Sequence, residues 1–193
     1  MNTEATERLI EVVPTPNPEA RMFKLTELLI PSGTHEFKLG DDTADSPLAR
    51  ALLALDAVEL VLIAPRFVTI RKRFDEEWRW LEPNVKASLD AFLDSGEMAV
   101  FEKVGDEAKP EREYTELETR ILAVLDEEVR PALAQDGGDL SFEGFEDGVV
   151  YLKLTGACGT CPSSTATLKS GIEYLLREEF EEVTEVVNVD PLI

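Results

Sequence analysis

Cysteine is scarce in this 193-residue chain, which has only Cys158 and Cys161, together with a single histidine. A structural zinc site takes four ligands, and a cubane-type iron–sulfur cluster usually takes four thiolates. The two thiols of one chain are therefore two ligands short of either kind of site. We expect the pair either to be redox-active or to be completed by a second chain.

Basic residues are also few, since 19 Lys and Arg face 40 Asp and Glu and the formal net charge is -21. Binding to nucleic acid draws its affinity from cations that neutralise phosphates. We therefore expect no nucleic-acid partner. The densest basic group, Arg66, Arg71, Lys72 and Arg73, is expected to be a solvated strand edge. The acidity favours solubility and attraction of basic partners.

Long hydrophobic runs are missing as well. The longest, from Val58 to Ala64, is interrupted by Glu59 and is far shorter than the roughly 20 residues that a membrane helix needs, so no membrane partner is expected. The first twenty residues contain four glutamates and no apolar core of a signal peptide. We expect a protein of the bacterial cytoplasm, or of an organellar matrix after processing.

The residues that are present predict two small α+β domains. The hydrophobic share of 44% is enough to build a core in each. Residues 103–112 are charged, contain one Gly and one Pro, and lack hydrophobic periodicity, as linkers do. We predict an N-terminal domain over residues 1–102, a linker over 103–112 and a C-terminal domain over 113–193.

The first domain shows mixed strand and helix signals. The turn at residues 15–18 contains two prolines and is extended, because proline disfavours helix in the residue before it. Ser46 suits the cap of a helix and Pro47 suits its first position. Apolar patterns predict the other elements, which are strands at 22–25, 58–63 and 67–74 and a helix that begins near Pro83.

The same domain offers no cysteine and no phosphate-binding glycine pattern. His35 lies in a polar stretch and is expected to be a loop residue. Trp78 and Trp80 are expected to anchor packing or to form a patch for a partner, rather than to stack on a cofactor.

The second domain has the order α-β-β-α-β. Apolar residues recur at helical spacing from Leu117 to Leu133, behind a capping box of Thr115 and Glu118. The Asp-Gly dipeptide at 147–148 suits the tight turn of a hairpin. The remaining signals are strands at 140–146, 149–154 and 183–189 and a second helix from Pro162. This order places the CxxC loop between the hairpin and the second helix, exposed at the end of the sheet.

Two groups of carboxylates in this domain are expected to be structural or solvated. Asp136 and Asp139 flank two glycines, which favours a helix end and a strand start over acid–base chemistry. A solvated face, with docking to a basic acceptor as the alternative, is expected for Glu178, Glu179, Glu181 and Glu182. No general acid, base or nucleophile is apparent apart from the thiols, so we do not expect an enzyme.

The cysteine spacing leaves three chemistries open. Pro162 suits the first helical position, which places Cys161 at the N-cap. The unpaired amides and the dipole of the helix start favour a thiolate there, and with it metal binding and nucleophilic attack. The candidates are a dithiol–disulfide redox pair as in thioredoxin-like proteins, a zinc ion shared by two chains, and an iron–sulfur cluster shared by two chains.

Three segments near the cysteines resemble the NifU C-terminal (Nfu-type) iron–sulfur scaffold domain. They are QDGGDL at 135–140, the run at 148–164 that contains TGACGTCPSS, and TLKSGIE at 167–173. The order of the DGGD segment, the CPSS loop and the helix makes this resemblance specific.

The N-terminal block is similar to the Nfu N-terminal domain. The similarity is carried by TPNP at 15–18, Phe23-Lys24 and LARALL at 48–53. Together the two resemblances cover nearly the whole chain.

The resemblance implies a scaffold or carrier that binds a 4Fe-4S cluster and hands it to apo-acceptor proteins. Cys158 and Cys161 would be the ligands, two from each chain of a homodimer that forms on cluster binding. A 2Fe-2S form is equally compatible with two cysteines per chain. An upstream assembly scaffold is a further expected partner, and the N-terminal domain, which has no ligand set, is expected to recognise partners or to tune transfer.

Overall fold

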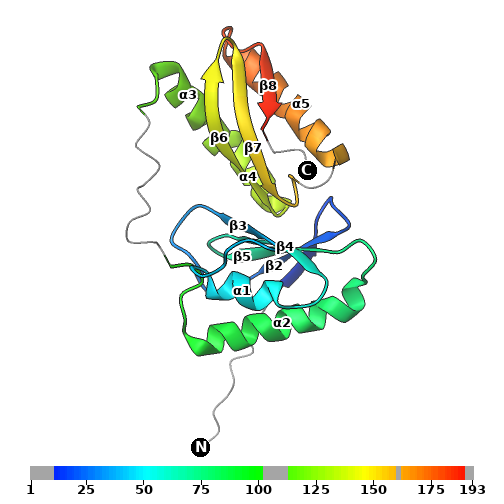
Figure 1. Ribbon diagram of the computed structural model, residues 1–193. Coiled ribbons are helices and arrows are strands. Elements are labelled where there is room, and N and C mark those ends of the chain that lie inside the picture. The colour runs from blue at the N-terminus through cyan, green and yellow to red at the C-terminus, as the bar shows by residue number, and fades with distance from the viewer. Residues whose placement is uncertain (1–10, 102–112, 160–161, 190–193) are drawn as a thin grey trace, which may run out of the picture. The chain divides into compact units, whose positions relative to one another are not determined.

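The computed structural model describes residues 11–101, 113–159 and 162–189, without the side chains of 162–164. These residues form two compact units, one that contains residues 11–14 and 19–101 and one that contains the residues from 113 onward (Figure 1). The predicted linker over 103–112 lies outside the described residues. The mixed α and β content is confirmed, with helices and a separate sheet in each unit. Among the described residues, no helix is both long enough and apolar enough to cross a membrane.

The first unit is a five-stranded sheet in the order β1-β2-β5-β4-β3, and every neighbouring pair of strands is antiparallel. Helices α1 and α2 lie on the same side of this sheet (Figure 1). Their apolar faces and one face of the sheet form a single core. The strands are β1 (Glu11–Pro14), β2 (Ala20–Lys24), β3 (His35–Lys38), β4 (Val58–Ile63) and β5 (Phe67–Lys72).

Helix α1 (Pro47–Leu53) begins where the sequence predicts. The buried hydroxyl of Ser46 accepts a hydrogen bond from the Ala49 N–H at 3.1 Å and donates one to the Ala99 carbonyl at 2.7 Å. Helix α2 (Trp78–Ser95) has Pro83 as its sixth residue, so the proline lies near the helix start, as the sequence predicts. The proline is tolerated close to the helix start because it removes only one helical hydrogen bond there.

Two expectations for this unit change. His35 is not in a loop but begins the edge strand β3, with its side chain exposed. Two members of the basic group, Arg71 and Lys72, lie on β5, which is not an edge strand because it lies between β2 and β4. Arg71 pairs with Glu59 at 3.3 Å, and the buried Lys72 pairs with Glu19.

The two tryptophans have different environments. Trp78 is buried in the core, next to Phe23, and so anchors packing as predicted. Trp80 is 66% exposed, and the guanidinium of Arg79 lies over its ring, 5.0 Å from the centroid.

The second unit is a three-stranded sheet in the order β6-β7-β8, made of β6 (Gly138–Glu146), β7 (Val149–Gly156) and β8 (Glu185–Asn188). Strands β6 and β7 form an antiparallel hairpin, whereas β8 pairs with β7 in parallel. The hairpin turn has positive φ at both Asp147 (49°) and Gly148 (85°), as a type I′ turn requires.

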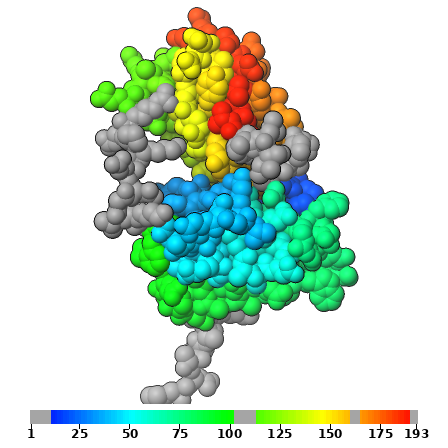
Figure 2. Space-filling view, viewed as in Figure 1, coloured from blue at the N-terminus to red at the C-terminus, as the bar shows by residue number. Residues whose placement is uncertain are grey.

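Helices cover one face of this sheet and bury its apolar side chains (Figure 1). In Figure 2 the opposite face of β6, β7 and β8 is open toward the viewer. The helical elements are α3 (Glu116–Val124), the π-helical turn Leu125–Val129, α4 (Arg130–Gln135) and α5 (Pro162–Glu179).

The first helical region departs from a regular α-helix. Its capping box is confirmed, because the Thr115 hydroxyl accepts from the Glu118 N–H and the Glu118 carboxylate accepts from the Thr115 N–H. The widened π turn at 125–129 comes just before Pro131, where the N–H of Arg130 donates to the carbonyl of Leu125. A proline at 131 cannot donate an amide proton to the preceding turn, which accounts for the local change of hydrogen-bond pattern.

Candidate functional site

Cys158 lies just beyond the carboxyl end of β7. The strand ends at Gly156, whose φ of 67° turns the chain out of the sheet. The N–H of Ala157 then donates to the carbonyl of Gly137 at 3.2 Å. Since Gly138 pairs with Gly156 across the hairpin, the DGGD segment and the first half of the cysteine loop lie side by side.

Two glycines make room for this arrangement. A Cβ atom at Gly138 would lie 2.5 Å from the Sγ atom of Cys158, and one at Gly159 would lie 2.4 Å from the carbonyl oxygen of Leu154. Both distances are far below van der Waals contact. The sequence marks these glycines as part of the motif, and the structure gives the steric reason for them.

The sequence predicts an exposed cysteine loop, but the structure buries its first cysteine. Cys158 is 3% exposed and packs with the core of its unit. The prediction is wrong for this residue because the missing side chain at Gly138 lets the sulfur turn inward, against β6.

Burial also sets the protonation state of Cys158. It raises the pKa of the thiol to about 12, with smaller contributions from the negative charges of Asp136 and then Asp139. At neutral pH the free protein therefore holds this sulfur as a thiol. The N-cap argument for a thiolate concerns Cys161, which lies outside the described residues.

The two aspartates occupy the structural positions that the sequence predicts. Asp136 caps the end of α4, and Asp139 is the second residue of β6. The Asp139 carboxylate accepts from Arg130 at 2.7 Å and from the Leu140 N–H at 2.8 Å. Their effect on the thiol was not foreseen, since it depends on how closely the hairpin end approaches Cys158.

One further side chain holds the loop in place and another holds the strand that leads into it, and sequence reasoning missed both. The Thr165 hydroxyl on α5 donates to the carbonyl of Cys158 at 2.8 Å. The Asn188 side chain on β8 accepts from the Leu154 N–H at 3.1 Å. Thr165 could have been suspected from its place in the first turn of the second helix, whereas nothing local marks Asn188.

Because Cys161 lies outside the described residues, the joint geometry of the CxxC pair stays a prediction. Cys158 is a free thiol. Within 11–101, 113–159 and 162–189, no three His, Cys, Asp or Glu side chains are arranged to hold a metal ion.

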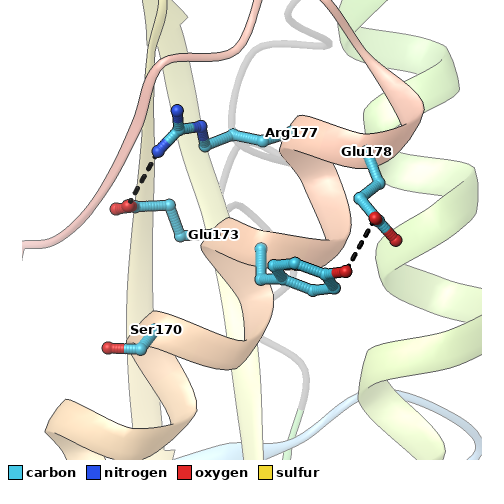
Figure 3. A pocket seen from close by; sticks show the side chains of 5 residues that line it. Ser170, Glu173, Arg177 and Glu178 are labelled. Atoms are coloured by element: carbon cyan, nitrogen blue, oxygen red, sulfur yellow. Dashed lines mark hydrogen bonds and ion pairs between the residues drawn. The ribbon is translucent and has the colours of Figure 1, made fainter.

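Farther along α5, a shallow hollow of about 510 Å³ lies on the exposed face of the helix (Figure 3). Its polar side chains satisfy one another: the Tyr174 hydroxyl donates to Glu178 at 2.7 Å, and Arg177 lies 3.7 Å from Glu173. Glu178, Glu179, Glu181 and Glu182 are all exposed, which confirms the predicted solvated face.

Comparison with known proteins gives matches in both units. The family model described as "NifU-like domain" matches residues 121–187, and the model described as "Scaffold protein Nfu/NifU N terminal" matches residues 10–96. A human protein named "NFU1 iron-sulfur cluster scaffold homolog, mitochondrial" is 36% identical over 181 residues, which are 93% of this chain and 71% of that protein. The chain belongs to the Nfu family.

Other Nfu relatives show a similar degree of identity. "NifU-like protein 5, mitochondrial" of Arabidopsis thaliana is 36% identical over 182 residues, covering 92% of this chain and 66% of that protein. A solution NMR structure of a NifU-like protein from Saccharomyces cerevisiae is 26% identical, covers 52% of this chain and 89% of that chain, and has a TM-score of 0.46. The NifU-like match includes Cys158, Cys161 and both aspartates.

Proposed function

We propose that this Nfu-family chain is an iron–sulfur cluster scaffold or carrier, in which Cys158 and Cys161 of two chains hold one 4Fe-4S cluster and pass it to apo-proteins. The observation that carries the proposal is the position of Cys158 in a glycine-lined turn of a domain that matches the NifU-like family model. The human relative is named an iron–sulfur cluster scaffold.

Sharing between chains follows from ligand number. A 4Fe-4S cluster usually takes four thiolates, and one chain supplies two. A second copy supplies the other two, which makes the homodimer a consequence of binding. A 2Fe-2S cluster has the same ligand count and is the alternative cargo.

The protonated state of Cys158 suits a carrier. A metal ligand must be a thiolate, so loading the cluster displaces the proton that burial stabilises. The proton returns when the cluster leaves, which favours release over permanent retention. Apo iron–sulfur proteins would receive the cluster, and an upstream assembly scaffold would supply it.

The thioredoxin-like alternative receives no support from Cys158. Disulfide exchange needs a reactive thiolate with access to its target. Cys158 is buried, and its pKa is raised rather than lowered.

The compartment is part of the proposal. The human and Arabidopsis relatives are mitochondrial by name. These names favour the organellar matrix for this chain, while the bacterial cytoplasm stays the second expectation.

Anaerobic reconstitution with iron and sulfide tests the proposal. We expect a brown protein with about four irons per pair of chains and a doubled mass by light scattering. Cys158→Ser and Cys161→Ser should each abolish colour and dimer together. Ser170→Ala, on the exposed face of α5, should leave both unchanged and serves as the control.

A colourless monomer after reconstitution would rule the proposal out. So would about half a zinc per chain that iron and sulfide do not displace, since that is the content of a zinc site shared by two chains. Rapid reduction of insulin by the apo-protein, lost in Cys158→Ser, would favour the redox alternative instead.

A further inference from the structure

The first unit has a hollow of about 250 Å³ that the cysteine site does not use. It lies where the carboxyl end of α1 meets the start of β4, and Leu39, which follows β3, forms one side. Most of its lining is apolar, namely Leu39, Leu53, Ala54, Leu55, Ala57 and Val58.

The floor of the hollow is fixed by a tight turn. The Val58 N–H donates to the carbonyl of Leu55 at 3.2 Å, and Ala57 between them has a φ of 85°. This conformation, typical of the third residue of a type II turn, favours glycine. The Ala57 carbonyl accepts from the Arg73 N–H at 2.8 Å, which ties the turn to the end of β5. The hollow is therefore preformed by backbone hydrogen bonds.

One wall of the hollow is an apolar side chain exposed to solvent. The Leu39 N–H donates to the Glu59 carbonyl at 2.8 Å, which holds its backbone beside β4. Its side chain is nevertheless 66% exposed and takes no part in the core. A leucine fixed in this position offers contact area to a partner that the unit itself does not use.

Carboxylates outnumber cations among the charged side chains that line the hollow, which are Asp56, Glu59 and Arg73. Lys38 lies 3.8 Å from Glu36, Arg71 pairs with Glu59, and Lys72 pairs with Glu19. Arg73 is shared among Asp56, Asp75 and Glu76. Asp41 and Asp42, in the exposed turn after Leu39, bind only backbone N–H groups among the contacts described. The ion pairs of Arg73 and Arg71 leave Asp41 and Asp42 without a cation partner among the contacts described.

We propose that this hollow binds a protein segment in which one or two apolar side chains are flanked by Lys or Arg. The apolar side chains would enter beside Leu39 and Val58, and the cations would face Asp56 and the aspartates of the 41–42 turn. The surplus of negative charge favours such a segment over an acidic one and speeds its encounter. The site is independent of the cluster chemistry and gives the N-terminal unit a recognition role.

The test uses the full-length apo-protein labelled with ¹⁵N and two peptides of equal charge, acetyl-GKRLLKRG-amide and acetyl-GKRSSKRG-amide. We expect the leucine peptide to shift the amide signals of Leu39, Leu55 and Val58, and to bind at least about fivefold tighter than the serine peptide. Because cluster and dimer are not involved, the result does not depend on the proposed function.

Two variants and two matched controls locate the site. Leu39→Ser and Asp56→Lys should each lower the affinity for the leucine peptide by about fivefold or more. Leu28→Ser removes another exposed leucine of the same unit, and Glu181→Lys makes the same charge reversal in the other unit. Both control variants should bind the leucine peptide within about twofold of the affinity of the parent protein.

Three results would overturn the proposal. One is an equal affinity for the two peptides. The second is an equal loss in Asp56→Lys and Glu181→Lys, which would reveal a non-specific charge effect. The third is a set of shifted signals that spares residues 39 and 53–59.

Discussion

The sulfur of Cys158 occupies the space that a side chain at Gly138 would need, with Sγ 2.5 Å from where a Cβ atom would stand. The second glycine of the DGGD segment and the first cysteine of the CxxC motif are therefore in close contact, although they are twenty positions apart in the sequence.

Gly138→Ala should expel the thiol from its place. The φ angle at Gly138 is not left-handed, so the effect is steric and should cost about 1–3 kcal/mol of unfolding free energy. The reconstituted variant should also lose its cluster faster. Urea unfolding and the decay of visible absorbance measure the two effects.

The matched control is Gly171→Ala on α5, where a Cβ atom would meet nothing within 4 Å. That change should stabilise the protein by about 0.5–1 kcal/mol, because alanine is the better helix former. Similar effects of the two alanines would show that Gly138 has no special steric role.

The stability of the apo-protein should fall as the pH rises above about 9. Burial raises the pKa of the Cys158 thiol in the folded state to about 12, from its ordinary value of 9.0. The buried thiol therefore contributes fully to the stability of the folded state below pH 9, where the folded and unfolded states both keep the proton. Above it the unfolded state ionises first, and the contribution is lost progressively up to about pH 12.

Above pH 9 the free energy of unfolding should fall by at most about 1.4 kcal/mol per pH unit. Urea unfolding between pH 7.5 and 10.5, with reductant present, measures it. Cys158→Ala should flatten the profile, whereas Cys161→Ala should leave the contribution of Cys158 in place. A Cys158→Ala profile as steep as that of the parent protein would contradict the assigned protonation state.

Thr165→Val should loosen the cysteine loop. The valine keeps the shape of threonine but removes the hydroxyl that donates to the Cys158 carbonyl at 2.8 Å. We expect a loss of about 1 kcal/mol in the apo-protein and faster release of the cluster to a chelator. Thr165→Ser keeps the hydroxyl and should behave like the parent; if the serine variant releases its cluster as fast as the valine variant, the hydrogen bond is not the cause.

Ser46→Ala should destabilise the first unit. The buried hydroxyl serves both the Ala49 N–H and the Ala99 carbonyl, so alanine leaves two buried groups unpaired. We expect a cost of about 2–3 kcal/mol by urea unfolding. Ser170→Ala, another helix-associated serine but an exposed one, should change stability by less than about 0.5 kcal/mol.

The sequence was informative wherever local chemistry decides structure. Ser46-Pro47, the Thr115–Glu118 capping box and the Asp147-Gly148 turn each depend on neighbouring residues, and each is found as predicted. The sequence does not indicate strands β1 and β3. Strand β1 ends in Pro14, and Phe37 is the one apolar residue of β3, so neither segment shows an alternating pattern.

The candidate site was predictable in its residues but not in its environment. The motif identifies the two cysteines and the glycines around them. It does not tell that Cys158 turns inward, because that depends on the pairing of Gly138 with Gly156 across the hairpin. The contact of Asn188 with Leu154 is even less local, since it joins residues 34 positions apart.

The parallel pairing of β8 with β7 has a consequence for folding order. The hairpin β6–β7 can close through a two-residue turn, but β8 can join only after the chain has passed through the cysteine loop and the whole of α5. Closing this crossover carries a larger entropic cost than closing the hairpin. We therefore expect the loop around Cys158 to become ordered late, together with the last strand. The surroundings of the Cys158 sulfur would then be complete only after the rest of the unit has assembled.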